Sequence, residues 1–270
     1  MDKITSADQI LFRASSVGKL ITSTGKLGDT AKTNLIETYT EQVEGRRNEF
    51  SNIYTDKGNA VQSDSIQLLR DVTGQNIREN RSKIRLKNEF ISGEIDAFVG
   101  ERLDKAIAVY DTKSSYDRVT FNKTRFSKAK KDEEQFNNDY KWQGISYMWL
   151  TGAEDFFLSY CLVNNTAEGI LSLKEKLKWQ IKEMDYSVSE DYKQKAKQIE
   201  INHIFDLGLF MDTYPFFEFD NDISEWHYDI PANDRVFIQN IKWKEEDKFT
   251  IINAVTNGRK WLQDNVFERK

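Results

Sequence analysis

The stretch GEIDAFVGERLDKAIAVYDTK, residues 93–113, decides the fold of this chain. Residues rich in β-branched and aromatic side chains lie on either side of a short polar break, which predicts two β-strands, Phe90–Phe98 and Ala106–Ser115. The break at Gly100–Lys105 is short enough for a tight turn. We therefore expect a β-hairpin near the centre of a sheet.

Three charged side chains of this hairpin can form a chemical site. Alternate residues of a strand share a face, so Asp111 and Lys113 point the same way, and the hairpin brings Asp96 beside them. Carboxylate oxygens are the ligands that hard divalent cations prefer, and a bound cation activates water. The pattern predicts metal-assisted phosphodiester hydrolysis, with Asp96 and Asp111 as direct ligands. An oxygen-only site favours Mg²⁺, with Mn²⁺ as a substitute.

Composition supports one large α/β domain and excludes several classes of site. The 270 residues are 39% hydrophobic, which is enough for a core. The single cysteine, Cys161, allows no internal disulfide and no Fe–S cluster, and the two histidines, His203 and His227, are far apart. No run of eighteen apolar residues and no signal-peptide pattern occurs, so we expect a cytoplasmic protein with no membrane segment.

Positive charge is concentrated directly after the second strand of the hairpin. The net charge is −5, but residues 1–150 carry 24 Lys and Arg against 22 Asp and Glu, and residues 113–131 are strongly basic. A basic loop beside a metal site predicts contact with the DNA backbone, whereas a basic loop alone is usually a solvated one. The candidate DNA-binding residues are Arg118, Lys123, Arg125, Lys128, Lys130 and Lys131.

The remaining elements predict a central mixed sheet flanked by helices. A helix begins near residues 13–20, where Ser15 or Ser16 is expected at the N-terminus, either as a simple N-cap or as a phosphate ligand. Further helices are expected at 33–43, 56–70, 139–150, 171–204 (two, broken near 187–189) and 245–266, and strands at 77–86, 156–163 and 236–243. We expect a single domain over 1–270, with a core at about 10–165 and additions over 166–270.

Four motifs in order carry a resemblance to a known family. They are RASSVGKL at 13–20, the pair Lys57-Gly58, the hairpin itself, and YKWQGISY at 140–147. With these motifs the chain resembles the lambda-exonuclease-like (YqaJ-type) phage recombination exonucleases of the PD-(D/E)XK nuclease superfamily. The resemblance covers residues 10–165 and implies a restriction-endonuclease-like core, with weaker similarity near 230–236 and in the last helix.

The resemblance also implies roles for individual residues. The backbone carbonyl of Thr112 would complete the metal site, and Lys113 would orient or deprotonate the attacking water. Gln143 and Tyr147 match the family's Gln-x-x-x-Tyr helix and would support the lysine or contact the DNA backbone. A core position for Tyr147 is the simpler alternative.

One position departs from the family pattern. The helix after Gly58 normally carries a glutamate four residues on, and Gln62 stands there instead. An amide can still hold a metal-bound water, but it lacks the charge, so Asp64 or Glu94 is a candidate substitute. Glu94 is equally well explained as a solvent-facing hairpin residue.

Three functions stay open at this point. The first is a Mg²⁺-dependent exonuclease that degrades duplex DNA ends, which the resemblance links to a single-strand annealing partner and a homotrimer in a phage-infected host's cytoplasm. The second is an endonuclease or repair nuclease of the same fold. The third is a DNA-binding protein in which Gln62 marks weakened catalysis.

Overall fold

The computed structural model describes residues 4–22, 24–47, 53–128, 136–183, 190–220, 223 and 229–268. The strands are β1 (Phe12–Arg13), β2 (Arg78–Glu79), β3 (Arg85–Lys87), β4 (Ile91–Glu94), β5 (Ala97–Val99), β6 (Ala108–Ser114), β7 (Asp155–Cys161) and β8 (Val236–Lys242). The α-helices are α1 (Ala14–Val17), α2 (Asp29–Glu44), α3 (Ile53–Ala60), α4 (Gln62–Thr73), α5 (Arg118–Lys128), α6 (Asn138–Thr151), α7 (Ala167–Glu183), α8 (Glu190–His203), α9 (Leu207–Thr213) and α10 (Glu245–Leu262).

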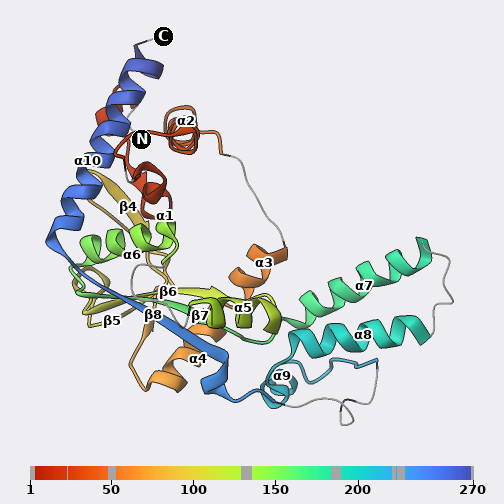
Figure 1. The fold of residues 1–270 in the computed structure, drawn as a ribbon. Helices are drawn as coiled ribbons and strands as arrows, with labels where there is room; N and C mark the ends of the chain where they lie inside the picture. Colours follow the sequence, from red (N-terminus) through yellow and green to blue (C-terminus); the bar gives the residue numbers. More distant parts are fainter. Residues whose placement is uncertain are drawn as a thin grey trace.

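A five-stranded mixed sheet in the order β2-β5-β6-β7-β8 forms the centre of the molecule (Figure 1). The hairpin pair β5 and β6 is antiparallel, β6 and β7 are parallel, and β8 adds antiparallel to β7. The parallel step is possible because α5 and α6 lie between β6 and β7 in the chain and provide the crossover. The mixed sheet flanked by helices that the sequence predicts is confirmed.

Alternation along β6 and β7 gives each face of the sheet its own hydrophobic core. Val109, Phe156 and Leu158 pack with α6 residues such as Ile145 in the larger core, on the face that also carries Asp111. On the opposite face, Tyr110 and neighbouring strand residues pack against α4. The sheet is therefore covered on both sides, and α6 is the helix that lies over the predicted site.

The prediction of one continuous strand at Phe90–Phe98 is wrong, because this stretch forms two strands in two different sheets. Residues 91–94 form β4 in a separate three-stranded sheet, β1-β4-β3, and residues 97–99 form β5 in the central one. The chain changes sheet at Ile95 and Asp96, which places Asp96 where the two sheets meet. Glu94 and Asp96 consequently do not share one strand face.

Three other expected elements are also corrected. The strand expected at 77–86 is two short strands, β2 and β3, separated by a turn. The helix expected at 56–70 is broken at Val61, where φ of −111° and ψ of 19° leave the helical range, so α3 and α4 are separate. The basic segment expected as a loop is largely the helix α5. This helix begins directly after Asp117, whose side chain accepts a hydrogen bond from the Thr120 amide (2.7 Å).

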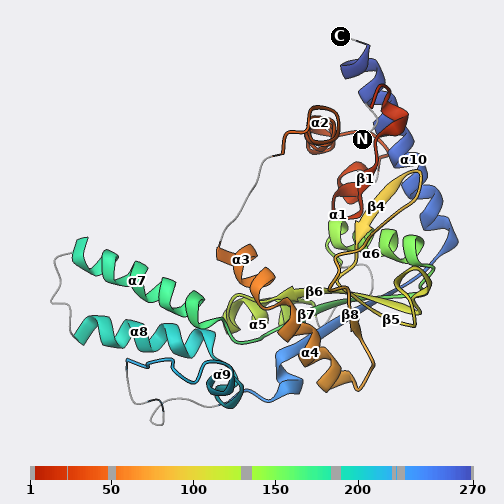
Figure 2. The same ribbon diagram turned by 180° about the vertical axis from the view of Figure 1, so that it is seen from behind.

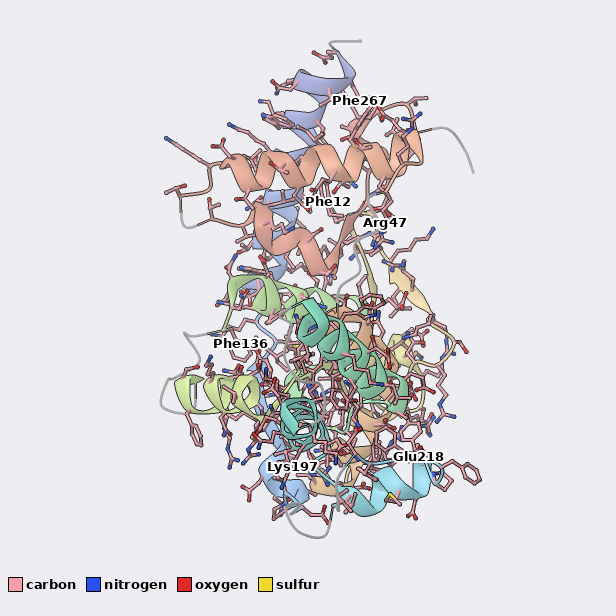
Figure 3. All side chains as sticks on the ribbon, turned by 90° about the vertical axis from the view of Figure 1, so that its right-hand side faces the viewer. Phe12, Arg47, Phe136, Lys197, Glu218 and Phe267 are labelled. Atoms are coloured by element: carbon pink, nitrogen blue, oxygen red, sulfur yellow. The ribbon has the colours of Figure 1, made fainter. Side chains whose placement is uncertain are left out.

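The N-terminal segment and the last helix pack together in a layer above the sheet (Figures 1 and 3). The terminal helix α10 runs beside α1 and α2, and Gly258 of α10 packs against Leu35 and Phe12, where a Cβ would lie 3.0 Å from Leu35. Figure 3 shows Phe12 and Phe267 in this layer, and the Phe267 ring meets Tyr39 edge-on at 5.2 Å. This layer fixes α6 from above, on the side away from the sheet.

The helices α7 and α8 extend away from the sheet as an antiparallel pair, with α9 beneath them (Figure 2). A small core of Ile170, Ile204 and Phe210 holds this unit together. The buried Lys174 ammonium forms ion pairs with Glu200 and Asp220, which tie the two helices to the segment after α9. Over the described residues, no helix is both long enough and apolar enough to cross a membrane.

Candidate active site

Asp96 and Asp111 face each other across the hairpin, as predicted. The β5–β6 ladder pairs Ala97 with Tyr110, and continuing that register by one residue sets Asp96 opposite Asp111. The Asp96 side chain, and not a backbone carbonyl, is the hydrogen-bond partner of the Thr112 amide on β6. Its Oδ2 accepts hydrogen bonds from the Thr112 amide (3.0 Å) and the Thr112 hydroxyl (3.3 Å). The Asp96 carboxylate is thus held by the strand that carries Asp111.

Lys113 lies on the same face and is paired with Asp111. Its Nζ is 2.7 Å from Asp111 Oδ2 and 4.9 Å from the centre of the Tyr140 ring, a cation–π contact. Burial acts to lower the pKa of Lys113, but the charge and hydrogen bond of Asp111 outweigh it and raise that pKa above its ordinary value. In this arrangement Lys113 is an ammonium that can donate hydrogen bonds.

The helix α6 supplies Gln143 and Tyr147, one turn apart. Gln143 Nε2 donates to Asp111 Oδ1 (3.0 Å) and to the Tyr147 hydroxyl oxygen (2.8 Å). Gln143 therefore holds the Asp111 carboxylate, which itself pairs with Lys113, and support of the lysine or contact with the DNA backbone stays a prediction. Tyr147 is 4% exposed and belongs to the large core, and burial followed by the Asp111 charge raises its pKa, so it stays protonated.

Two glycines allow α6 to approach the strands this closely. A Cβ on Gly144 would lie 2.1 Å from Phe156 Cδ1, and one on Gly93 would lie 2.8 Å from Tyr147 Cε1. Neither position has room for a larger residue, since the facing atoms belong to buried aromatic rings. Close packing at Gly144 and Gly93 is what places Gln143 within reach of Asp111.

The charge of Asp111 acts on the Asp96 carboxyl group beside it. Burial and then the nearby Asp111 charge raise the pKa of Asp96 from its ordinary value of 3.8 to about 6, although the Thr112 amide opposes this. Asp111 is 2% exposed, and its Oδ2 lies 2.7 Å from the Lys113 ammonium. Two adjacent carboxylates, Asp96 and the buried Asp111, supply oxygen ligands of the kind that a divalent cation prefers.

The donor set for a cation is small. Over the described residues, no group of three or more Asp, Glu, His or Cys side chains converges in a way that could hold a metal ion. Glu94 pairs with Arg85 at 3.3 Å, and the Gln62 amide oxygen accepts a hydrogen bond from Lys83 (2.8 Å). These contacts leave Asp96 and Asp111 as the candidate side-chain ligands, and a role of the Thr112 carbonyl stays a prediction. A set this small would leave positions for waters, as Mg²⁺ prefers.

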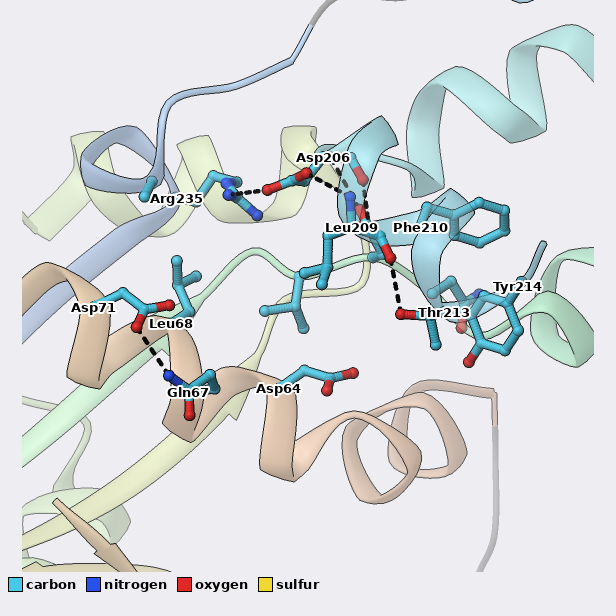
Figure 4. Close-up of a pocket in the computed structure, with 14 residues that line it drawn as sticks. Asp64, Gln67, Leu68, Asp71, Asp206, Leu209, Phe210, Thr213, Tyr214 and Arg235 are labelled. Atoms are coloured by element: carbon cyan, nitrogen blue, oxygen red, sulfur yellow. Dashed lines mark hydrogen bonds and ion pairs between the residues drawn. The ribbon is translucent and has the colours of Figure 1, made fainter.

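Asp64, the other candidate substitute, faces away from the site. It lies on α4 two residues after Gln62, about 200° around the helix at 3.6 residues per turn. Its side chain lines a cavity of about 270 Å³ between α4 and α9 (Figure 4). Arg235 and Asp206 form an ion pair of 2.8 Å at the same cavity, and neither Asp96 nor Asp111 lines it.

The serines at the first helix are not N-caps. Arg13 occupies the N-cap position of α1, so Ser15 and Ser16 lie within its single turn. The Ser16 hydroxyl donates to the Arg13 carbonyl at 3.3 Å, and Ser15 is exposed. The N-cap expectation is wrong, and a phosphate contact at either serine stays a prediction.

The basic residues after the hairpin divide into three groups. Arg118 and Arg125 both donate to the Asp234 carbonyl (2.8 and 3.3 Å), so they join α5 to the turn before β8. Lys123 is exposed on α5. The Lys128 side chain, Lys130 and Lys131 lie outside the described residues. Contact of any of these with DNA stays a prediction.

Three further residues at or near the site have no chemical role assigned by the sequence motifs. Tyr140 precedes Gln143 by three residues, so helical spacing would have placed it on the same face. Lys57 is 5% exposed and its ammonium donates to the carbonyls of Ser115 (2.9 Å) and Tyr116 (2.8 Å), which secures the end of β6. Lys83 contacts Gln62 from a turn 21 residues away, a tertiary contact that local pattern does not reveal.

Comparison with known proteins identifies the class of fold. No family model and no curated protein sequence matches the chain. Its structure does match those of exonucleases: the chain shares their α/β fold, in which mixed sheets are flanked by helices, and the resemblance stated above is confirmed at the level of the fold.

Two solved proteins illustrate the match. The crystal structure of a phage-related exonuclease from Haemophilus somnus 129PT is 23% identical, with a TM-score of 0.64 over 97% of each chain. The alkaline exonuclease LHK-Exo from Laribacter hongkongensis is 12% identical, with a TM-score of 0.56 over 97% of this chain and 92% of that one. The complex of LHK-Exo with dAMP also matches, with a TM-score of 0.56 and 12% identity over 98% and 93% of the two chains.

Proposed function

We propose that this protein is a metal-dependent deoxyribonuclease, and most specifically an exonuclease acting on the ends of duplex DNA. The observation that carries the proposal is the pair formed by Asp96 and the buried Asp111, with Lys113 on the same face, in a chain whose fold matches exonucleases along 97% of its length. The dAMP complex of the Laribacter exonuclease supports a nucleotide substrate for this fold.

Each residue of the site has a distinct role in the proposed hydrolysis. Asp96 and Asp111, with the Thr112 carbonyl, would hold Mg²⁺ or Mn²⁺, which when bound polarises a phosphate and lowers the pKa of water. Gln143 fixes the Asp111 carboxylate by a 3.0 Å hydrogen bond, so that ligand needs little reorganisation. The Lys113 ammonium can donate to the attacking water and to the phosphate oxygens as negative charge increases there.

The proposed action on DNA ends is supported by the exonuclease neighbours and not by the site geometry. The experiment that tests it compares substrates. We expect the purified protein with Mg²⁺ to digest linear duplex DNA and to leave a covalently closed circle of the same sequence intact. EDTA should stop the digestion. Linear substrates labelled at the 5′ or the 3′ end report which strand is degraded, and cleavage of the circle at a similar rate would favour the endonuclease.

Gln62 is the observation that favours the second candidate, a DNA-binding protein with weakened catalysis. Its amide oxygen contacts Lys83 instead of adding a third carboxylate beside Asp96 and Asp111. Binding of DNA without digestion in either Mg²⁺ or Mn²⁺ would favour this candidate over the nuclease.

Two partners belong to the same proposal. A recombination exonuclease exposes single strands, so a single-strand annealing protein is the expected protein partner, and a homotrimer is the expected assembly. Both come from the resemblance to the phage family, and light scattering of the purified chain measures the second directly.

A further inference from the structure

The turn between β2 and β3 is built onto the backbone of Asp96. Asn80 is 6% exposed, and its amide nitrogen donates to the carbonyls of Ile84 (2.9 Å) and Ile95 (3.0 Å). Its side-chain oxygen accepts from the Ile84 amide (3.0 Å), and its own backbone amide donates to the Asp96 carbonyl (2.9 Å). The turn therefore cannot move independently of the carboxylate site.

Lys83 adopts a disfavoured backbone conformation within this turn. Its φ is +51°, in the left-handed region, and it is the one residue other than glycine with a positive φ in the described part of the chain. Its amide donates to the Asn80 carbonyl at 2.9 Å, which closes the turn. Residues held in such conformations by their surroundings cluster at functional sites, because the conformation aims a side chain or backbone group at a target.

The target of Lys83 is the start of α4. Its Nζ donates to Gln62 Oε1 at 2.8 Å, and a second link between the Ser63 hydroxyl and Glu79 (2.7 Å) joins the same two segments. The ammonium is also close enough to Asp96 for its charge to act on that carboxyl group and oppose the rise in its pKa. Gln62 and Lys83 thus lie at the margin of the site.

The charge of Lys83 is balanced differently from that of its neighbours. Arg81 pairs with Glu79 at 3.0 Å, and Arg85 pairs with Glu94 at 3.3 Å. Lys83 donates instead to a neutral amide, and its side chain is exposed. A fixed, exposed ammonium that contacts an uncharged group keeps its full charge for an incoming anion.

We propose that Lys83, oriented by Gln62, forms a subsite for a phosphate of the DNA backbone beside Asp96 and Asp111. This inference rests on the proposed function, since it adds a phosphate contact to the same site. It gives Gln62 a different role from a weakened metal ligand. A neutral amide orients the ammonium and leaves its charge available, whereas a glutamate there would form an ion pair and compete with the phosphate.

Binding measured against salt concentration tests the subsite. Fluorescence anisotropy with an end-labelled linear duplex in EDTA gives the binding constant without cleavage. Lys83→Asn removes the charge but keeps a residue that tolerates a left-handed backbone, and Lys83→Arg keeps the charge. We expect Lys83→Asn to reduce the slope of log K against log salt by about 0.9, the loss of one phosphate contact. Lys83→Arg should retain the wild-type slope.

Two more variants complete the experiment. Lys105→Ala, in the turn at the far end of the hairpin, is the matched control and should leave the slope unchanged. Gln62→Glu should weaken DNA binding and lower kcat/KM, because the introduced carboxylate would form an ion pair with Lys83 and compete with the phosphate. Circular dichroism melting of each variant reports whether it is folded.

The outcomes separate this inference from the proposed function. If wild type binds and digests DNA but Lys83→Asn keeps the wild-type slope, the subsite is refuted and the nuclease stands. Tighter Mg²⁺ binding or faster digestion by Gln62→Glu would also overturn the subsite, since Gln62 would then be a weakened metal ligand. If wild type neither binds nor digests DNA, both proposals fail.

Discussion

Replacement of Asp96 by asparagine should make the metal-free protein more stable while removing its activity. The pKa of Asp96 is raised from 3.8 to about 6, first by burial and then by Asp111. A carboxyl group whose pKa is higher in the folded state than in the unfolded state binds more protons when folded, so its contribution to stability decreases as the pH rises from about 4 through 6. At neutral pH the ionised Asp96 therefore destabilises the fold.

The size of the effect follows from the shift. About two pKa units at 1.36 kcal/mol each correspond to about 3 kcal/mol at pH 7. Asparagine keeps an oxygen that can accept the hydrogen bond from the Thr112 amide, so the substitution removes the charge and retains the contact. We expect Asp96→Asn to raise the free energy of unfolding by up to about 3 kcal/mol at pH 7 to 8.

Urea denaturation in EDTA at a series of pH values measures this difference. The advantage of Asp96→Asn should shrink between pH 6 and pH 4, where wild-type Asp96 becomes protonated. Asp104→Asn is the matched control, because Asp104 pairs with Arg102 on the exposed turn of the same hairpin. Equal stability of Asp96→Asn and wild type at pH 7.5, or a difference independent of pH, would refute the reasoning.

Three further predictions test the packing around the site. Gln143→Met should weaken Mg²⁺ or Mn²⁺ binding by about 10- to 100-fold in a calorimetric titration, because Asp111 loses the group that orients it; unchanged affinity would show that Gln143 is not needed. Gly144→Ala should destabilise the fold by about 3 kcal/mol because its Cβ meets Phe156, while Gly58→Ala on α3, where no atom lies within 4 Å, should be neutral or stabilising. Burial lowers the pKa of Lys57 to about 7, although the Asp117 charge opposes this. The free energy of unfolding of wild type should therefore increase as the pH rises from 7 toward 10, and that of Lys57→Met should not show this increase. Parallel pH profiles of the two proteins would contradict this prediction.

The parts of the site that could be predicted from sequence are those encoded locally. Alternation at period two placed Asp111 and Lys113 on one face, and the short turn brought Asp96 opposite, as the β5–β6 register confirms. Gln143 and Tyr147 share a helix face because they are four residues apart. Each of these relations depends on spacing within a single element or across one turn.

The parts that were missed depend on contacts between distant segments. A continuous β-rich stretch carries no information about which sheet each half joins, so the change of sheet at Asp96 was not foreseen. The many charges of the segment after the hairpin predict a loop, yet Phe121 anchors this segment as a buried helix residue. The contact between Gln62 and Lys83 joins the start of α4 to the turn between β2 and β3, and the local sequence of neither segment reveals the other.

The rate of nucleotide release from linear duplex DNA with saturating Mg²⁺ tests the central claim most directly, because it asks whether Asp96 and Asp111 form a hydrolytic site. Wild type and Asp104→Asn should digest the duplex at the same rate, and Asp111→Asn should be slower by at least about 100-fold, as expected when a principal electrostatic group of the transition state is lost. Digestion by Asp111→Asn at the wild-type rate would contradict the account.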